Sequence, residues 1–328
     1  MVLAVLFAAP VAGQGISSAG TPVAPAPAPT LDPGVLAPLY GVGSLTLTTL
    51  DFVGGPGAAE MLVEVPIGTD IWTLSLEPIS LRADSFQVLV DDGSGVLTPH
   101  PAPPIRTRKG TVLEIPGSEV RASYDGHDLT ALIETSNASW VVQPVSDVGI
   151  DSRETWHVVY EARDTLPGPW TCGVKDSQFG GSTGGTGGPL PFGTIFDLTE
   201  VGIDADFEFY QLNGSNVAST VNDVEAVMNG VSGTYDDPGI LIAYELTTIV
   251  VRTNSADPYG SNSNPGSLLG AFDSVWSSAP ENAIQRDVAH LFTGVNLDGS
   301  VIGIANLTDI CTTNAYGLSQ SRFSTNFN

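Results

Sequence analysis

The residues best suited to chemistry in this 328-residue chain are two cysteines and four histidines. They are Cys172, Cys311, His100, His127, His157 and His290. No histidine lies four residues from another, and none is followed by glutamate, so the chain lacks the His-Glu-x-x-His pattern with which one helix binds zinc. The histidines alone therefore do not predict a zinc site.

Cys172 is followed by a tract that is nearly without side chains. It stands in the sequence TCGV, and six of the nine residues from Gly180 to Gly188 are glycine. Ordering such a tract costs much entropy, so we expect an exposed tether that proteases can reach. A phosphate-binding loop is excluded because no Gly-Lys-Ser/Thr follows. A surface thiol explains Cys172 as well as a metal ligand does, and we expect no disulfide with Cys311 across the tract.

The charge balance limits the partners of this protein. There are 36 acidic and 11 basic residues, which gives a formal net charge of −25. Such a chain repels phosphate backbones and anionic lipid headgroups, so nucleic acid and membrane surfaces are poor candidates. Solubility or the binding of hard cations fits this composition better.

The first 40 residues read as a targeting segment and a linker. Residues 1–15, MVLAVLFAAPVAGQG, resemble the apolar core and cleavage end of a secretory signal, although a buried N-terminal segment is the alternative. Residues 16–40 are rich in Pro and Ala and predict a stiff linker. No apolar window is long enough to predict a membrane span. We therefore expect a secreted, extracellular protein.

Residues 41–178 carry the pattern of an antiparallel β domain. Short alternating runs such as SFQVLV, GTVLEI, DLTALIE and SWVVQPV are separated by Pro-Gly, Asp-Gly and Ser-Asn turns. Alternation with period two predicts a sheet that is buried on one face. Asp91, Asp92 and Gly93 could form a calcium loop, but the hairpin turn expected there needs the same residues and is favoured.

Beyond a Gly-rich segment at 179–194, residues 195–328 alternate between strand and helix patterns. FDLTEVGIDADFEFY predicts a strand, and the apolar spacing from Val217 to Val231 predicts a helix, with Thr220 and Asp223 placed like a capping box. GILIAYELTTIVVRT predicts a second strand and PGSLLGAFDSVWSSA a second helix. AHLFTGVNLDGSVIGIANL predicts two further short strands, so this part is α/β.

Several segments in order resemble one family of enzymes. Residues 286–317, RDVAHLFTGVNLDGSVIGIANLTDICTTNAYG, resemble the stretch that precedes the active-site helix in adamalysin-type (reprolysin) zinc metalloproteases, which are metzincins. The βαβα order of residues 200–279 is similar to the first half of that catalytic domain. Residues 109–145 resemble the family's propeptide, and TCGV at 171–174 is similar to its cysteine switch, with the residues Pro-Trp-Thr just before Cys172.

The resemblance implies a zymogen with an α+β, mostly antiparallel β, prodomain and an incomplete α/β metzincin-like catalytic domain. The domains are then a propeptide at 41–178, an activation tether at 179–194 that an activating protease cuts, and the N-terminal part of the catalytic domain at 195–328. Cys172 would be an inhibitory zinc ligand. The motif HExxHxxGxxH is absent, so we expect an N-terminal part of a secreted zinc metalloendopeptidase that is inactive as it stands, rather than a degenerate homologue.

The resemblance also assigns individual residues. Gly303, Ile304 and Ala305 match the edge strand that holds an extended peptide substrate by backbone pairing. Packing of the Ile302 and Ile304 side chains in a core is compatible with this role, because only the backbone need serve the substrate. Glu200 and Asp287 match calcium ligands of the family, and solvated charges are the alternative. Zinc would be the cofactor of the complete protein, and proteins or peptides its substrates.

A function of another class remains open at this level. A non-catalytic, secreted, β-rich binding or adhesion module would also be acidic and rich in turns. An in-frame HExxHxxGxxH in the coding sequence beyond Asn328 would favour the protease, whereas a stop codon or an unrelated repeat array would favour the module.

Overall fold

The structure is a computed structural model that describes residues 31–150, 155–166, 168, 171–172, 197–235, 242–306 and 314–321, with the backbone alone at 171, 172 and 197. The signal-like segment, the tether at 179–194 and Cys311 lie outside the described residues. The chain forms two compact units. The β-sheet unit comprises Ala8–Ile79 and Arg106–Pro167. The α/β unit comprises Ser80–Ile105 and Gly168–Asn328; Met1–Phe7 group with it but lie outside the described residues.

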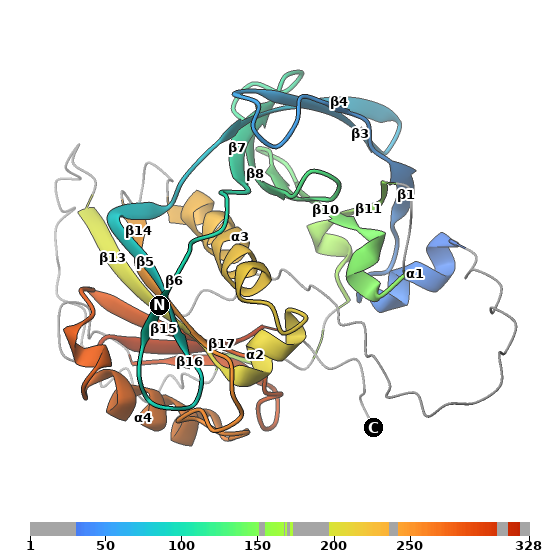
Figure 1. Cartoon of the computed structure of the whole chain (residues 1–328). Helices are drawn as coiled ribbons and strands as arrows, with labels where there is room; N and C mark the ends of the chain where they lie inside the picture. The colour runs from blue at the N-terminus through green and yellow to red at the C-terminus, as the bar shows by residue number, and fades with distance from the viewer. Residues whose placement is uncertain are drawn as a thin grey trace, which may run out of the picture. The chain divides into compact units, whose positions relative to one another are not determined.

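The β-sheet unit is one antiparallel sheet with the strand order β1-β11-β10-β9-β8-β7-β4-β3-β2 (Figure 1). Its elements are α1 (Pro33–Leu39), β1 (Thr46–Thr49), β2 (Phe52–Val53), β3 (Met61–Ile67), β4 (Asp70–Pro78), β7 (Thr107–Val112), β8 (Glu119–Tyr124), β9 (Leu129–Glu134), β10 (Ser139–Pro144) and β11 (Trp156–Glu161). Short 3₁₀ turns lie at Val145–Val148 and Ala162–Asp164. The antiparallel β pattern predicted for this region is confirmed.

Alternation along these strands builds the core of the β-sheet unit. In β3 every second side chain is buried, from Met61 to Ile67, and β9 repeats this pattern with Leu129, Ala131 and Ile133. These side chains form one apolar cluster inside the curled sheet. On the other face α1 packs Leu36 and its neighbours against β10 and β11 in a second cluster.

The α/β unit is a mixed sheet with the strand order β12-β16-β17-β15-β13-β14-β5-β6. Its strands are β5 (Arg82–Asp91), β6 (Thr98–His100), β12 (Thr171–Cys172), β13 (Asp197–Ala205), β14 (Ile242–Arg252), β15 (Val288–Thr293), β16 (Val301–Ala305) and β17 (Tyr316–Gln320). Its helices are α2 (Phe207–Leu212), α3 (Val217–Tyr235), α4 (Pro265–Trp276) and a 3₁₀ turn, η4 (Glu281–Ala283). β16 and β6 run antiparallel to their neighbours β17 and β5, and the other pairs are parallel.

Helices cover both faces of this sheet (Figure 1). α2 and α3 pack on one face, where Phe209, Val224 and Met228 join Ile203 and Ile249. α4 packs on the other face through a separate apolar cluster that includes Phe272 and Trp276. The central strands are therefore buried on both sides, as parallel strands of α/β proteins are.

The two units do not divide at the glycine tract, where the predicted domains divide, because Ser80–Ile105 precede the tract but belong to the α/β unit. SFQVLV lies in β5, which pairs with β14 of the α/β unit and not with the antiparallel sheet. Val88 and Leu89 are neighbours in sequence and both buried, one on each face of the sheet, because helices cover both faces. β5 and β6 form the expected hairpin, and Asp91 and Asp92 cap its turn.

Two local predictions were wrong. The segment FEFY does not extend the first strand, because Asp206 accepts the N–H of Phe209 and starts α2 there. Thr220 does not cap α3, since Asn216 accepts the N–H of Ser219 and the helix already begins at Val217. The other predicted helix and strands of residues 195–305 are present.

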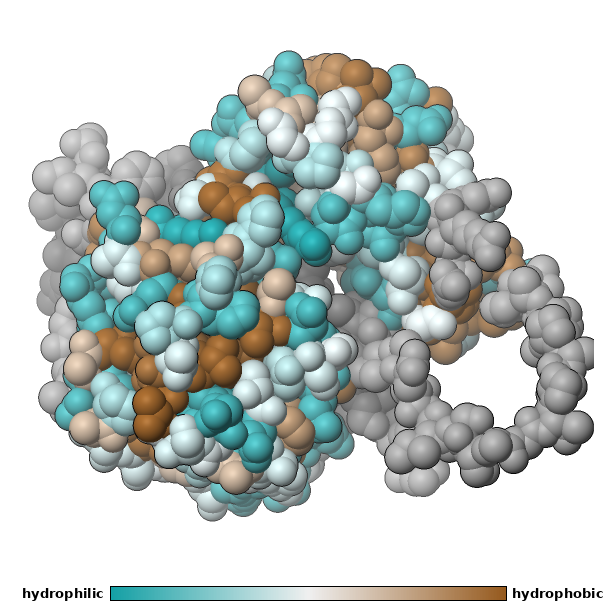
Figure 2. Space-filling model, in the orientation of Figure 1, coloured by the Kyte–Doolittle hydropathy of each residue, from teal (hydrophilic) through white to brown (hydrophobic). Residues whose placement is uncertain are grey.

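The surface carries apolar side chains beside polar ones. On the visible face of the α/β unit they gather in a band (Figure 2). Among the described residues, no helix combines the length and the apolar character that crossing a membrane requires.

Candidate functional site

The predicted substrate strand lies beside Cys172 in the sheet of the α/β unit. Gly303, Ile304 and Ala305 are on β16, which pairs with β17 on one side. On its other side the two-residue strand β12 runs parallel to it, with Thr171 opposite Val301 and Cys172 opposite Gly303. The backbone of Thr171 and Cys172 thus occupies the outer edge of β16.

Packing of the β16 side chains is compatible with backbone pairing at the edge of this strand. Val301 and Ile304 pack against the apolar cluster under α4. Gly303 is buried and has no side chain that could obstruct a neighbouring strand. Because the side chains anchor the strand, its backbone N–H and C=O groups are left for pairing at the edge, which β12 takes up.

The predicted calcium ligands Glu200 and Asp287 lie in contact. The Glu200 N–H donates to Asp287 Oδ2 at 2.9 Å, and the Asp287 N–H donates to the Glu200 carbonyl at 2.8 Å. Gln285 Nε2 donates to Glu200 Oε1, so each carboxylate already holds a protein donor. Beside them lies an open pocket of about 400 Å³ that is also lined by Arg286 and Tyr316.

The four histidines do not converge. His100 on β6 and His127 in a turn are exposed. His157 is buried in the β-sheet unit, where Nε2 accepts a backbone N–H. His290 on β15 shares a hydrogen bond of 3.1 Å between Nε2 and Ser319 Oγ, and burial lowers its pKa to about 4.

These residues do not fit a zinc ion. Within the part of the chain that the structure describes, no group of three or more His, Cys, Asp or Glu side chains could hold a metal. A catalytic zinc site needs three protein ligands. The described residues therefore contain the predicted substrate strand, but no three of their His, Cys, Asp or Glu side chains form a metal centre.

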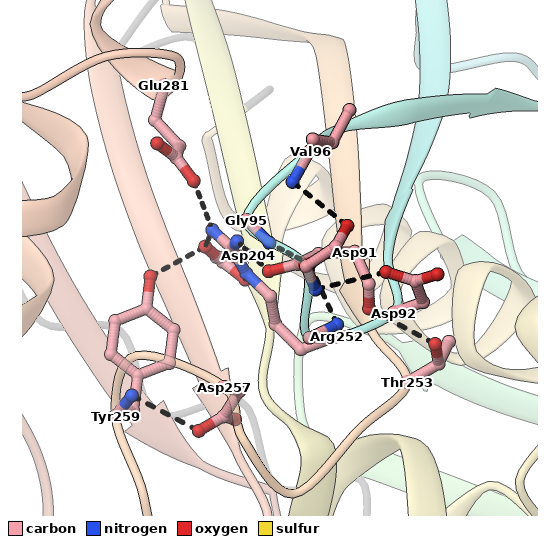
Figure 3. Close-up of polar contacts among 12 residues, drawn as sticks. Asp91, Asp92, Gly95, Val96, Asp204, Arg252, Thr253, Asp257, Tyr259 and Glu281 are labelled. Carbon is pink, nitrogen blue, oxygen red and sulfur yellow. Dashed lines mark hydrogen bonds and ion pairs between the residues drawn. The ribbon is translucent and has the colours of Figure 1, made fainter.

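The most elaborate polar cluster lies at the ends of β5, β13 and β14 (Figure 3). The Arg252 guanidinium donates through Nε and Nη2 to both oxygens of Asp204, at 3.0 and 2.7 Å. Its Nη1 donates to Asp91 Oδ2 at 2.9 Å, and Nη2 also donates to Glu281 Oε1 at 2.9 Å. Tyr259 Oη donates to Asp204 Oδ2 at 2.6 Å. We call these five residues the Arg252 cluster.

Burial makes the Arg252 cluster a structural element. Arg252 and Asp204 are 1 % and 0 % exposed. Burial alone lowers the pKa of Arg252, but the charge and hydrogen bonds of Asp204, with further help from Tyr259 and Glu281, hold it well above its ordinary value. Every carboxylate of the cluster receives a donor, so the cluster fastens three strands and η4 together.

Sequence reasoning missed both β12 and the Arg252 cluster. A strand of two residues has no periodicity, and Gly and Pro surround it, so nothing in its own sequence distinguishes it from a loop. The sequence indicates the cluster only weakly. The apolar runs VLV and IVV are each followed by a charged residue, Asp91 and Arg252, and such charges are not buried without a partner.

Comparisons with known proteins concern the part of the chain that contains β16. Residues 198–327 match the reprolysin-type family Reprolysin_5, described as metallo-peptidase family M12. No match was found among curated proteins. A solved structure, metalloproteinase-II from Bacteroides fragilis, is 12 % identical over 81 % of this chain and 76 % of that chain, with a TM-score of 0.39, too low to carry an argument.

The family match covers β13 to β17 together with α2, α3 and α4, and so includes the predicted substrate strand β16. The resemblance of the residues around β15 and β16 points to the same group of proteins. Residues 198–327 thus match the model of metallo-peptidase family M12, and this match supports a metzincin-type metallopeptidase for this segment of the chain.

Proposed function

We propose that this chain belongs to the precursor of a secreted zinc metalloendopeptidase, in which the segment around Cys172 keeps the substrate edge closed. The observation that carries the proposal is the pairing of Thr171–Cys172 with β16, opposite Val301 and Gly303. The M12 match over residues 198–327 supports the reaction class, which is hydrolysis of peptide bonds in protein substrates.

The pairing blocks the substrate edge for as long as β12 stays on β16. An extended peptide binds a sheet edge through the unpaired N–H and C=O groups of the outermost strand. β12 uses that edge of β16, so a substrate must displace it before it can pair with Gly303 to Ala305. Occupation of the edge and cleavage of a substrate are therefore mutually exclusive.

The thiol adds a second element in the proposed precursor. A cysteine thiolate is a strong zinc ligand and would take the position that a catalytic metal keeps open for water. The zinc-binding motif is not among residues 1–328 and the described residues form no metal site, so we assign the metal and the hydrolysis to a longer form of the protein.

The remaining features fit a secreted zymogen. The Gly-rich residues at 179–194 lie between Cys172 and β13 in the sequence, so a cut there by an activating protease would separate the inhibitory segment from β13. The apolar residues 1–15 are consistent with export. We do not include calcium in the proposed function, since Glu200 and Asp287 already hold protein donors.

The experiment that tests the proposed function begins with the coding sequence beyond Asn328. We expect an in-frame HExxHxxGxxH and, after a cut within residues 179–194, peptide hydrolysis that a zinc chelator abolishes. A stop codon or an unrelated repeat array at that place, or a cut protein that cleaves no peptide, would contradict the protease assignment.

A further inference from the structure

The N-terminal half of the chain contributes two strands to the sheet of the α/β unit. β5 and β6 lie within Ser80–Ile105, and the chain on both sides of this segment belongs to the β-sheet unit. The segment precedes the glycine tract at 180–188, whereas its partner strand β14 follows the tract. A cut in the tract would therefore place β5 and β14 on different polypeptides.

The pairing between β5 and β14 is extensive. Gln87 to Asp91 lie opposite Thr248 to Arg252 in parallel register, and the Leu246 N–H donates to the Leu81 carbonyl at 2.7 Å. Val88 packs in the cluster under α3, and Leu89 packs in the cluster under α4. β5 therefore completes both apolar cores of the α/β unit.

Two ion pairs fix the ends of β5. At its start Arg82 donates to both carboxylate oxygens of Glu225 on α3, with Nη2 to Oε2 at 2.9 Å. At its end Asp91 accepts from Arg252 at 2.9 Å. These charged groups are almost fully buried, with exposed fractions of 3 % for Glu225, 3 % for Asp91 and 1 % for Arg252. Water therefore reaches them only if β5 leaves the sheet.

Loss of β5 would be costly for the rest of the unit. β14 would become an edge strand with unpaired backbone groups, and Glu225 would lose its buried cationic partner. A buried charge that loses one partner destabilises a protein strongly, and both apolar cores would be opened to water at the same time.

We propose that a chain cut between Cys172 and Asp197 stays together as a noncovalent complex, in which the N-terminal polypeptide remains a permanent subunit through β5 and β6. β12 and β5 lie towards opposite edges of the same sheet, beyond β16 and beyond β14. If the proposed function holds, activation is then a local release of β12 from β16, and the propeptide is retained.

The test replaces residues 180–188 of the chain with the recognition sequence of a site-specific protease, and the readout is mass instead of hydrolysis. After complete cutting, we expect both pieces to elute from a sizing column as one particle with the mass of the uncut chain, at nanomolar loading and in high salt. Separate elution of the pieces, or precipitation of the C-terminal piece, would overturn the proposal. Neither result depends on whether the protein is a protease.

Variants separate the contribution of β5 from other contacts. Asp91→Ala removes the partner of Arg252 and should make the cut pieces dissociate at least about a hundredfold faster. Asp92→Ala is the matched control, because Asp92 is exposed and its side chain accepts the Ser94 N–H in the turn, so the rate should not change. Equal rates for both variants would overturn the role of β5. If Asp91→Ala does not fold before cutting, Glu225→Gln weakens the other end of β5 and must accelerate dissociation in the same way.

Discussion

Trp276 Nε1 donates a hydrogen bond to Asp204 Oδ2 at 2.8 Å, which joins the last turn of α4 to the end of β13. Asp204 is fully buried and also accepts from Arg252 and Tyr259. One carboxylate therefore fastens a helix, a neighbouring strand and a loop. It lies inside the M12 segment but carries none of the proposed chemistry.

Asp204→Asn should destabilise the α/β unit by about 3 kcal/mol, because the amide removes one partner of a buried charge and turns a donor towards Arg252. Hydrogen exchange of the β13 and β14 amides measures this free energy separately from the β-sheet unit. Asp298→Asn is the control, since Asp298 is exposed, and it should stay within about 0.5 kcal/mol of the wild type. Equal protection in both variants would contradict the structural role of the Arg252 cluster.

His157 should make the β-sheet unit sensitive to acid. Its Nε2 accepts the Leu129 N–H at 3.0 Å and its Nδ1 donates to the Thr155 carbonyl at 2.7 Å, so the neutral ring fits and the protonated ring does not. Burial lowers the pKa of His157 below 6.5. The unfolded chain then binds the proton more readily, and the free energy of unfolding falls as the pH drops below about 6.5, by at most about 1.4 kcal/mol per pH unit.

Denaturation of the β-sheet unit between pH 7 and pH 5 measures this effect. His157→Gln should remove the part of the pH dependence that His157 causes, although the variant is less stable at pH 7. His127→Gln changes an exposed histidine and should retain the wild-type pH dependence. An unchanged slope in His157→Gln would show that the ring is not held in its neutral form.

Asp206 should give the α/β unit a pH dependence of the unfolding free energy that is opposite in sign to the one His157 gives the β-sheet unit. Its Oδ1 accepts the N–H groups of Phe209 and Gly294, at 2.7 and 3.0 Å, but burial dominates and raises its pKa to about 7. The folded state binds the proton more readily than the unfolded chain, so this contribution is complete below about pH 4 and is lost as the pH rises to about 7.

Asp206→Asn keeps an oxygen that can accept both N–H groups and does not ionise. The difference in unfolding free energy between wild type and this variant should fall from pH 4 to pH 7 by at most about 1.4 kcal/mol per pH unit. Hydrogen exchange in α2 follows the difference. A difference that does not depend on pH would mean that Asp206 stays ionised when buried.

Gly110 on β7 tests the close pairing of β7 with β4. A Cβ at this position would lie 1.8 Å from the Ser75 carbonyl oxygen, so Gly110→Ala must separate the two strands. We expect a loss of several kcal/mol in the β-sheet unit. Gly57→Ala places a methyl group where nothing lies within 4 Å and should be nearly neutral by thermal denaturation. Equal melting temperatures for the two variants would contradict this packing.

The elements that sequence reasoning found are those in which one pattern dominates. The alternation in β9 and the helical spacing of α3 and α4 arise from burial on one face, and this burial is visible in the sequence pattern. β14, rich in β-branched residues, was evident for the same reason.

The elements that it missed depend on partners far away in the chain. SFQVLV is a strand in either sheet, and its choice of β14 rests on Asp91 meeting Arg252 and Arg82 meeting Glu225, contacts that no local pattern encodes. β12 exists because β16 offers an unpaired edge, so two residues without any periodicity become a strand. Gly303 to Ala305 were proposed as a substrate edge from family resemblance alone, whereas the pairing of β16 with Cys172 needed the structure.

The most direct measurement compares peptide hydrolysis by the uncut precursor in its longer, zinc-binding form with and without Cys172. We predict that Cys172→Ala cleaves peptides before any cut within residues 179–194, while the wild type and Cys311→Ala stay silent until that cut is made. The contradicting result is an uncut Cys172→Ala precursor that is as silent as the wild type and becomes active only after cutting. It would show that the segment on β16 does not keep the enzyme closed through Cys172.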